Sequence, residues 1–173
     1  MMTFAAVLQL LVALSFVSIP LVRHRYGPRA TDAAHAELRR QGVSPGVLAD
    51  NGMRFDASGH ESAVPVAVAL VMTALAVLNL TGSPLGGTLS WALQPVVLAG
   101  NLVILYSQLT AARSVEAAFA RKGDPELARI DVRALLRAAE SGFPSWVMPG
   151  LQNVRHALVM GGSALVLLAL ALA

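Results

Sequence analysis

Three amide side chains recur at intervals of seven residues within one long apolar stretch of the chain: Gln94, Asn101 and Gln108. On an α-helix, seven residues make nearly two turns, so successive members of such a row drift by only about 20° around the helix. An amide that faces lipid is costly, because its hydrogen bonds are left unmade. The spacing therefore predicts a polar row that points toward neighbouring helices.

Other apolar stretches contain polar residues that are able to meet this row. We predict Gln9 and Asn79 as further members of a polar pocket, with Thr73 and Ser163 as additional partners. Such a pocket has two interpretations. The amides either join helices, with each interhelical hydrogen bond contributing about 0.6 kcal/mol, or they line a site for a ligand, a lipid headgroup or an ion. We favour the first, because amides alone cannot carry charge and no apolar stretch has an ionisable residue in its middle.

A second group of candidate residues lies where apolar stretches meet charged ones. This predicted interface cluster consists of His24, His60, Glu61, Arg155 and His156. Imidazole and carboxylate groups bind metals and exchange protons. However, no spacing of the His-x-x-x-His or Glu-x-x-His kind fixes two ligands on one helix, and charged residues are common anchors at the ends of membrane spans. We therefore predict no metal site, no catalytic residue and no cofactor.

The elements that must position these residues are apolar helices. About 20 apolar residues cross the hydrocarbon of a bilayer, since each residue of a helix rises about 1.5 Å. Four segments of the chain fit this length: 4–22, 63–80, 89–112 and 154–173. We predict an all-α integral membrane protein, with an antiparallel four-helix transmembrane bundle and a small helical cytoplasmic cap, forming a single membrane domain over 1–173.

The connections between the predicted spans differ sharply in charge. The turn at 81–88 is rich in Gly, Ser and Pro, whereas the loops at 23–62 and 113–153, together with Arg155, hold all 13 Lys+Arg residues. Positively charged loops stay in the cytoplasm. We therefore expect both charged loops to be cytoplasmic and both termini to be outside a bacterial plasma membrane. The first span carries no positive charge before its apolar run, which favours a retained span over a cleaved signal peptide.

Each charged loop is expected to contain a helix. In the first loop, Thr31 and Asp32 resemble an N-cap for a short helix over 33–41. In the second loop, Asp124 and Pro125 predict a helix that runs to Glu140.

The second of these helices has an apolar face predicted to consist of Leu127, Ile130, Ala134 and Ala138. It either packs on the other loop, which we favour, or lies in the membrane surface and binds anionic lipid. Trp146, which follows it, is typical of the headgroup level.

Small residues at Ala157 and Gly161 resemble a helix-packing motif. We expect them to pack within the bundle rather than between two copies of the chain.

Several function classes are excluded or weakened by composition. The chain has no cysteine, which excludes disulfides and thiolate chemistry. A net charge of +3 is too small to indicate a nucleic-acid partner, and no phosphate-binding, dinucleotide-binding, nucleophile-elbow or calcium-loop motif is present.

We predict a non-catalytic accessory, assembly or scaffold subunit of an envelope complex. It would contact membrane lipid and either other membrane proteins or further copies of itself. A lipid- or quinone-handling enzyme and a small-solute transporter or channel remain alternatives. The second is weakened by the absence of an internal repeat.

Overall fold

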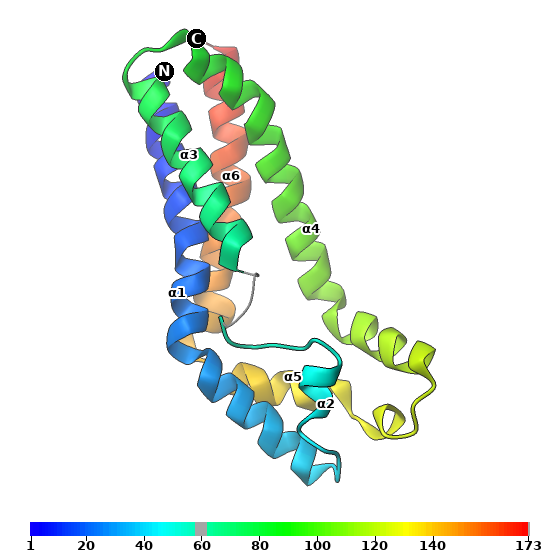
Figure 1. Cartoon of the computed structure of the whole chain (residues 1–173). Helices are drawn as coiled ribbons and strands as arrows, with labels where there is room; N and C mark the ends of the chain where they lie inside the picture. Colours follow the sequence, from blue (N-terminus) through cyan, green and yellow to red (C-terminus); the bar gives the residue numbers. More distant parts are fainter. Residues whose placement is uncertain (58–61, 173) are drawn as a thin grey trace. The chain divides into compact units, whose positions relative to one another are not determined.

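The computed structural model describes residues 1–57 and 62–172, and this part of the chain contains helices and no strand (Figure 1). Three helices are long and apolar enough to cross a membrane: α1 (Met2–Arg40), α3 (Ala63–Leu80) and α4 (Pro84–Lys122). A fourth such segment, Trp146–Ala171, joins the π-helical turn η3 (Trp146–Leu151) to α6 (Gln152–Ala171). The prediction of an all-helical chain with four potential membrane spans is confirmed.

Three short helices of the described chain lie in the predicted loops. They are α2 (Val47–Asp50), the 3-10 turn η2 (Leu127–Arg129) and α5 (Val132–Ser141).

The chain separates into two compact units. The first, which we call the apolar unit, consists of Met1–Leu21, His60–Leu105 and Gly150–Ala173. The second, the charged unit, consists of Val22–Gly59 and Tyr106–Pro149. Of the charged residues that the structure describes, only Arg155 falls in the apolar unit. Helices α1 and α4 each begin in the apolar unit and end in the charged unit.

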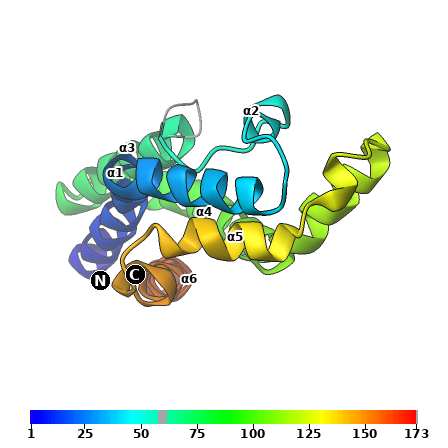
Figure 2. The same ribbon diagram turned by 90° about the horizontal axis from the view of Figure 1, so that it is seen from below.

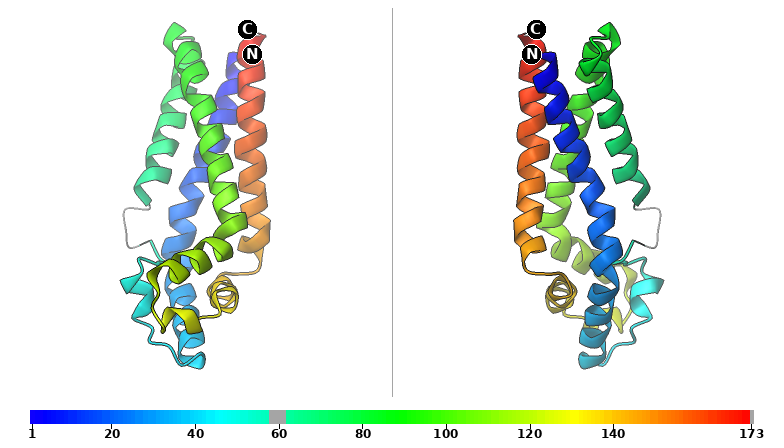
Figure 3. Two further views of the ribbon diagram at one scale, coloured as in Figure 1. Left: turned by 90° about the vertical axis from the view of Figure 1, so that its right-hand side faces the viewer. Right: turned by 90° about the vertical axis from the view of Figure 1, so that its left-hand side faces the viewer.

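In the apolar unit, segments of all four long helices lie side by side (Figure 3). Two small clusters of buried apolar residues hold them together. One surrounds Val12, Met72 and Val159, and the other surrounds Ala5 and Val166. Most large apolar side chains are instead exposed on the outside of these helices, as is expected of a unit that faces lipid.

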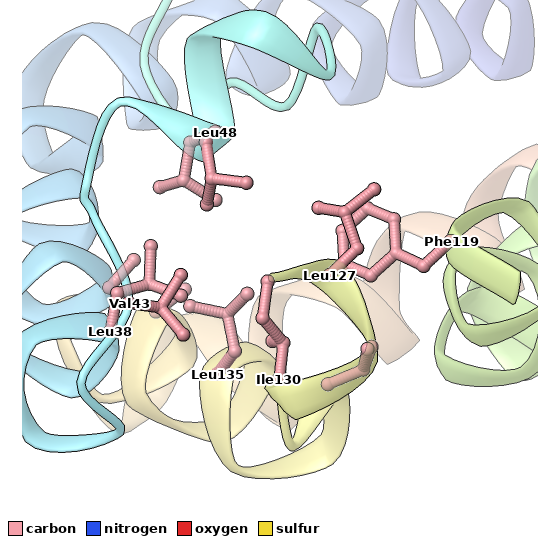
Figure 4. Packing of buried hydrophobic residues seen from close by; sticks show 11 residues of the cluster. Leu38, Val43, Leu48, Phe119, Leu127, Ile130 and Leu135 are labelled. Atoms are coloured by element: carbon pink, nitrogen blue, oxygen red, sulfur yellow. The ribbon is translucent and has the colours of Figure 1, made fainter. Parts of the chain in front are cut away.

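The charged unit has the larger apolar core, shown in Figure 4. Side chains from α1, the loop after it, α4, η2 and α5 converge there. The core residues include Leu38, Val43, Leu48, Phe119, Leu127, Ile130 and Leu135. Helix α5 runs along the second half of α1 (Figure 2). The two helices meet at Gly142, where a Cβ would stand 2.4 Å from the Cα of Ala30.

Helix α1 differs from the prediction, because it continues without a break from Met2 to Arg40 and no separate helix begins at 33. The predicted N-cap has another role. The Thr31 hydroxyl donates a hydrogen bond to the carbonyl oxygen of Gly27 at 3.1 Å, which is the pattern of a threonine inside a helix. Pro20 and Pro28 are both accommodated within this helix.

The predicted helix from Asp124 to Glu140 is also corrected, because extended backbone at Ile130 divides it into η2 and α5. Asp131 is the N-cap of α5 and accepts a hydrogen bond from the backbone N–H of Ala134 at 2.9 Å. The interruption changes which residues of the helix face inward. Val132, Leu135 and Ala139 are the buried residues of α5, rather than the predicted Ala134 and Ala138.

The turn between α3 and α4 is shorter than predicted, because α4 begins at Pro84 rather than at 89. Gly82 supplies the positive φ of 69° that reverses the chain.

Candidate functional site

Five buried polar side chains of the apolar unit form one hydrogen-bonded network. The Nε2 of Gln9 donates to the hydroxyl of Ser90 at 2.9 Å and to Oε1 of Gln94 at 3.5 Å. The Nδ2 of Asn79 donates to Oε1 of Gln9 at 2.8 Å and to the Ser90 hydroxyl at 3.0 Å. The Nε2 of Gln94 donates to the hydroxyl of Ser163 at 2.8 Å. The network therefore takes members from all four long helices.

The network is closed to solvent. Gln9, Ser90, Gln94 and Ser163 are 0% exposed, and Asn79 is 3% exposed. None of the five is ionisable, so the network cannot by itself exchange protons or carry a charge. Hydrogen bonds between such groups hold helices together in an apolar surrounding, where the unmade bond is costly.

The Oδ1 of Asn79 is the one acceptor of this network that has no hydrogen-bond donor. It lies against the backbone of Gly86, where a Cβ would stand 2.5 Å from it. A glycine is needed here because any side chain would push the end of α3 away from the start of α4. This close contact therefore holds the Asn79 side chain in its position within the network.

Four predicted residues meet in this network, namely Gln9, Asn79, Gln94 and Ser163. Ser90 was not predicted. It stands four residues before Gln94 on the same face of α4, so a search at spacings of three and four residues finds it, whereas the seven-residue spacing does not. Thr73 does not join, since its hydroxyl donates to the carbonyl oxygen of Ala69 in its own helix.

The other two members of the predicted row lie apart from the network. Asn101 is 5% exposed, and its Nδ2 has no hydrogen-bond acceptor among the described residues. Gln108 is exposed and belongs to the charged unit. The three residues of the predicted row therefore differ. Gln94 is hydrogen-bonded within the network, Asn101 is buried with a donor that has no acceptor among the described residues, and Gln108 is exposed.

The predicted interface cluster takes its members from both units. His24 lies in the charged unit and is exposed, whereas Arg155 and His156 lie in the apolar unit and are half-buried. His60 and Glu61 lie outside the described residues. Within the described part of the chain, no group of three His, Asp or Glu residues is placed to hold a metal ion. The cluster remains a prediction.

In the charged unit, polar contacts join the two loops at several points. The Gln41 side chain accepts a hydrogen bond from the backbone N–H of Asp131 at 2.8 Å, and Glu126 accepts one from that of Ser44 at 3.0 Å. Lys122 donates to the side-chain oxygen of Asn51 at 2.5 Å. These hydrogen bonds join the segment before α3 to the end of α4 and to the segment after it. The two loops therefore fold as one body.

The Glu37 carboxylate of the charged unit accepts hydrogen bonds from two neighbouring side chains. Arg40 donates to it from Nε at 2.7 Å, and the Gln41 amide donates to it at 2.6 Å. These hydrogen bonds, first that of Arg40 and then that of Gln41, lower the pKa of Glu37 from 4.5 to about 2. The ionised form is therefore part of the folded structure at neutral pH.

A shallow groove of about 210 Å³ lies between the loop after α2 and the last turns of α4. Its lining is mainly apolar, and its one cation, Lys122, is already bound to Asn51. Apart from Lys122 and Asn51, the hydroxyl of Ser114 is the one polar side chain in this lining, so the groove has little that would select a ligand.

Comparison with known proteins adds no functional assignment. No family model matches the chain, and no curated protein and no solved structure is significantly similar to it.

Proposed function

We propose that this chain is a non-catalytic, multi-pass subunit of a complex in a bacterial plasma membrane, with both termini outside and the charged unit in the cytoplasm. One observation carries the proposal. Five buried polar side chains that lie between the four long helices form a closed network without an ionisable group. Such a network joins helices and leaves no reactive group for catalysis.

The charged unit supports a role in assembly. It has a core of its own and hydrogen bonds between its two loops, so it is a folded body rather than a pair of linkers. Nearly all charged residues of the chain lie on it, and a folded, charged surface suits contact with another protein.

The orientation rests on the positive-inside rule and is tested by cysteine labelling in intact cells, because the chain has no cysteine of its own. Ser83→Cys, in the turn before α4, should react with an impermeant reagent from outside. Ser44→Cys and Ser141→Cys, one in each charged loop, should react only after the cells are opened. Labelling of Ser44→Cys in intact cells would overturn the orientation.

The functional proposal is tested by extracting the tagged chain in discs of native membrane and measuring what accompanies it by mass spectrometry. A membrane protein present at a fixed ratio to the chain, retained after a second purification step, would support an accessory subunit. A chain that purifies alone with one enriched quinone, lipid or metal would overturn it.

One observation favours a second candidate, a lipid- or quinone-handling enzyme with a polar site between the spans. The Nδ2 of Asn101 is a buried donor that lacks an acceptor, and a carbonyl oxygen of a quinone or lipid would satisfy it. In that case, Asn101→Leu should remove the co-purifying molecule. Gln94→Leu, seven residues earlier in α4 and within the hydrogen-bonded network, is the control for indirect loss through misfolding.

A further inference from the structure

Two aromatic side chains of the charged unit pack against each other although they are far apart in the sequence. The rings of Tyr26 in α1 and Trp146 in η3 meet edge to face, with centroids 6.2 Å apart and an interplanar angle of 83°. This geometry is the favoured one for aromatic pairs. Trp146 nevertheless remains 56% exposed, so the contact fixes its position without covering it.

Both aromatic residues stand just beyond an apolar span. Tyr26 follows the predicted end of the first span at Val22 by one helical turn. Trp146 lies eight residues before the predicted last span, 154–173, and is the first residue of the fourth apolar helical segment, Trp146–Ala171. Tyr and Trp at such positions settle among lipid headgroups, because their rings are apolar and their N–H or O–H groups are polar. The pair therefore marks the level of the membrane surface.

Two arginines beside this pair are not used by the fold. Arg25 and Arg29 stand four residues apart in α1 and are exposed. Neither forms a hydrogen bond or an ion pair with any described residue, although the Arg25 guanidinium lies 5.8 Å from the centroid of the Tyr26 ring. Several other arginines of the charged unit do have partners. Arg23 donates to the backbone oxygens of Arg54 and Asp56, and Arg40 pairs with Glu37.

Helix α5, the other basic element of this unit, does not suit a membrane surface. Its apolar residues Val132, Leu135 and Ala139 are buried in the core, so they are not free to enter lipid. Of its arginines, Arg133 is paired with Glu116. The prediction that α5 packs on the other loop, rather than lying in the membrane as a lipid-binding helix, is thereby supported. The Tyr26–Trp146 pair, with Arg25 and Arg29 beside it, is better suited to a lipid headgroup.

We propose that Arg25, Arg29 and Trp146 form a binding site for the headgroup of an anionic phospholipid. The two guanidinium groups pair with the phosphate and the further negative charge of the headgroup, while the Trp146 ring packs against the glycerol and upper acyl region. That the lipid belongs to the cytoplasmic leaflet rests on the orientation proposed above. The site itself does not depend on that orientation.

The site is tested with the full chain carrying Trp91→Phe, which leaves Trp146 as its only tryptophan. The protein is reconstituted in phosphatidylcholine vesicles containing phosphatidylglycerol, with bromine on the upper acyl chain of one lipid or the other. At equal bromine content, brominated phosphatidylglycerol should quench Trp146 about two- to fivefold more strongly than brominated phosphatidylcholine, because each arginine at a surface attracts anionic lipid about fivefold.

Matched variants separate a site from a general effect of charge. Arg25→Gln with Arg29→Gln should abolish the preference for phosphatidylglycerol. Arg133→Gln with Arg137→Gln, which removes the same charge from α5, should retain it. The site would be overturned if both double variants lost the preference for phosphatidylglycerol equally. It would also be overturned if the parent protein showed no such preference, or if neither brominated lipid quenched Trp146.

Cysteine labelling at Ser44 and Ser83 in the same vesicles gives the orientation independently. A lipid preference that persists in a chain with reversed labelling would retain the site and refute only the proposed orientation.

Discussion

All the buried polar side chains of the described residues lie in the apolar unit, whereas the charged unit buries only apolar side chains. The surfaces are reversed in the same way. Large apolar side chains cover the outside of the apolar unit, and charged residues cover the charged unit. With the apolar unit in lipid, as proposed, the two units follow the same rule in two solvents, since each buries what its surroundings solvate poorly or leave unsatisfied. The kind of substitution that destabilises one unit should be tolerated by the other.

The largest expected effect is the loss of core volume in the charged unit. Leu135→Ala removes a side chain that is 0% exposed, and we expect the free energy of unfolding to fall by about 2–5 kcal/mol. The measurement is urea unfolding in detergent, followed by Trp146 fluorescence in a Trp91→Phe background. Leu14→Ala, at a position that is 64% exposed in the apolar unit, is the control and should change little. Comparable losses in both variants would refute the contrast between the two units.

A smaller effect is expected where α5 approaches α1. Gly142→Ala places a Cβ 2.4 Å from the Cα of Ala30, so the helices must separate, at a cost of about 1–3 kcal/mol. The same fluorescence assay measures it. Gly46→Ala is the control, because the nearest atom to its Cβ would be 3.5 Å away. A urea midpoint unchanged by Gly142→Ala would show that α5 does not pack closely against α1 at Ala30.

In the apolar unit, the sensitive positions are polar. Gln94→Leu removes the hydrogen bonds to Gln9 and Ser163, and we expect a loss of about 1–2 kcal/mol. Asn101→Leu on the same helix should be neutral or stabilising, because it removes a buried donor that has no acceptor. Thermal unfolding in detergent compares the two. Greater damage from Asn101→Leu would mean that Asn101 has a partner, which would favour a ligand site.

The smallest effect concerns pH and should appear only in the charged unit. The pKa of Glu37 is lowered to about 2 in the folded protein from an ordinary value of 4.5. Its ionised form therefore stabilises the fold fully above about pH 4.5, and this contribution is lost as the pH falls toward 2. Unfolding curves over this range should show a weaker acid dependence in Glu37→Gln. Arg40→Gln should move the loss to higher pH, and identical profiles for all three proteins would exclude Glu37 as a contributor.

The number of long apolar helices could be predicted, because length and apolarity alone define them. The predicted second span, 63–80, has the same bounds as α3. Four members of the polar network were also predictable, since an amide in an apolar helix must find a partner. Ser90 was missed because a serine is common in membrane helices and does not by itself indicate a network.

What could not be predicted depends on contacts between distant segments. Thr31 and Asp32 have the residue types of an N-cap, yet α1 continues through them because Ala30, Ala34 and Leu38 are buried against the second loop. Similarly, the pattern after Asp124 fits one helix, but the N–H of Asp131 bonds to Gln41 and its side chain caps α5. Local propensity is overridden in both places by partners about a hundred residues away.

The core of the charged unit, in which Leu38 from the first loop meets Leu135 from the second, has a consequence for biosynthesis. At about 5–20 residues per second, Leu135 leaves the ribosome roughly 5–20 s after Leu38. During that interval the apolar residues of the first loop have no partner, while α3 and α4 are still being synthesised. Completion of this core is therefore a late event in the life of the nascent chain.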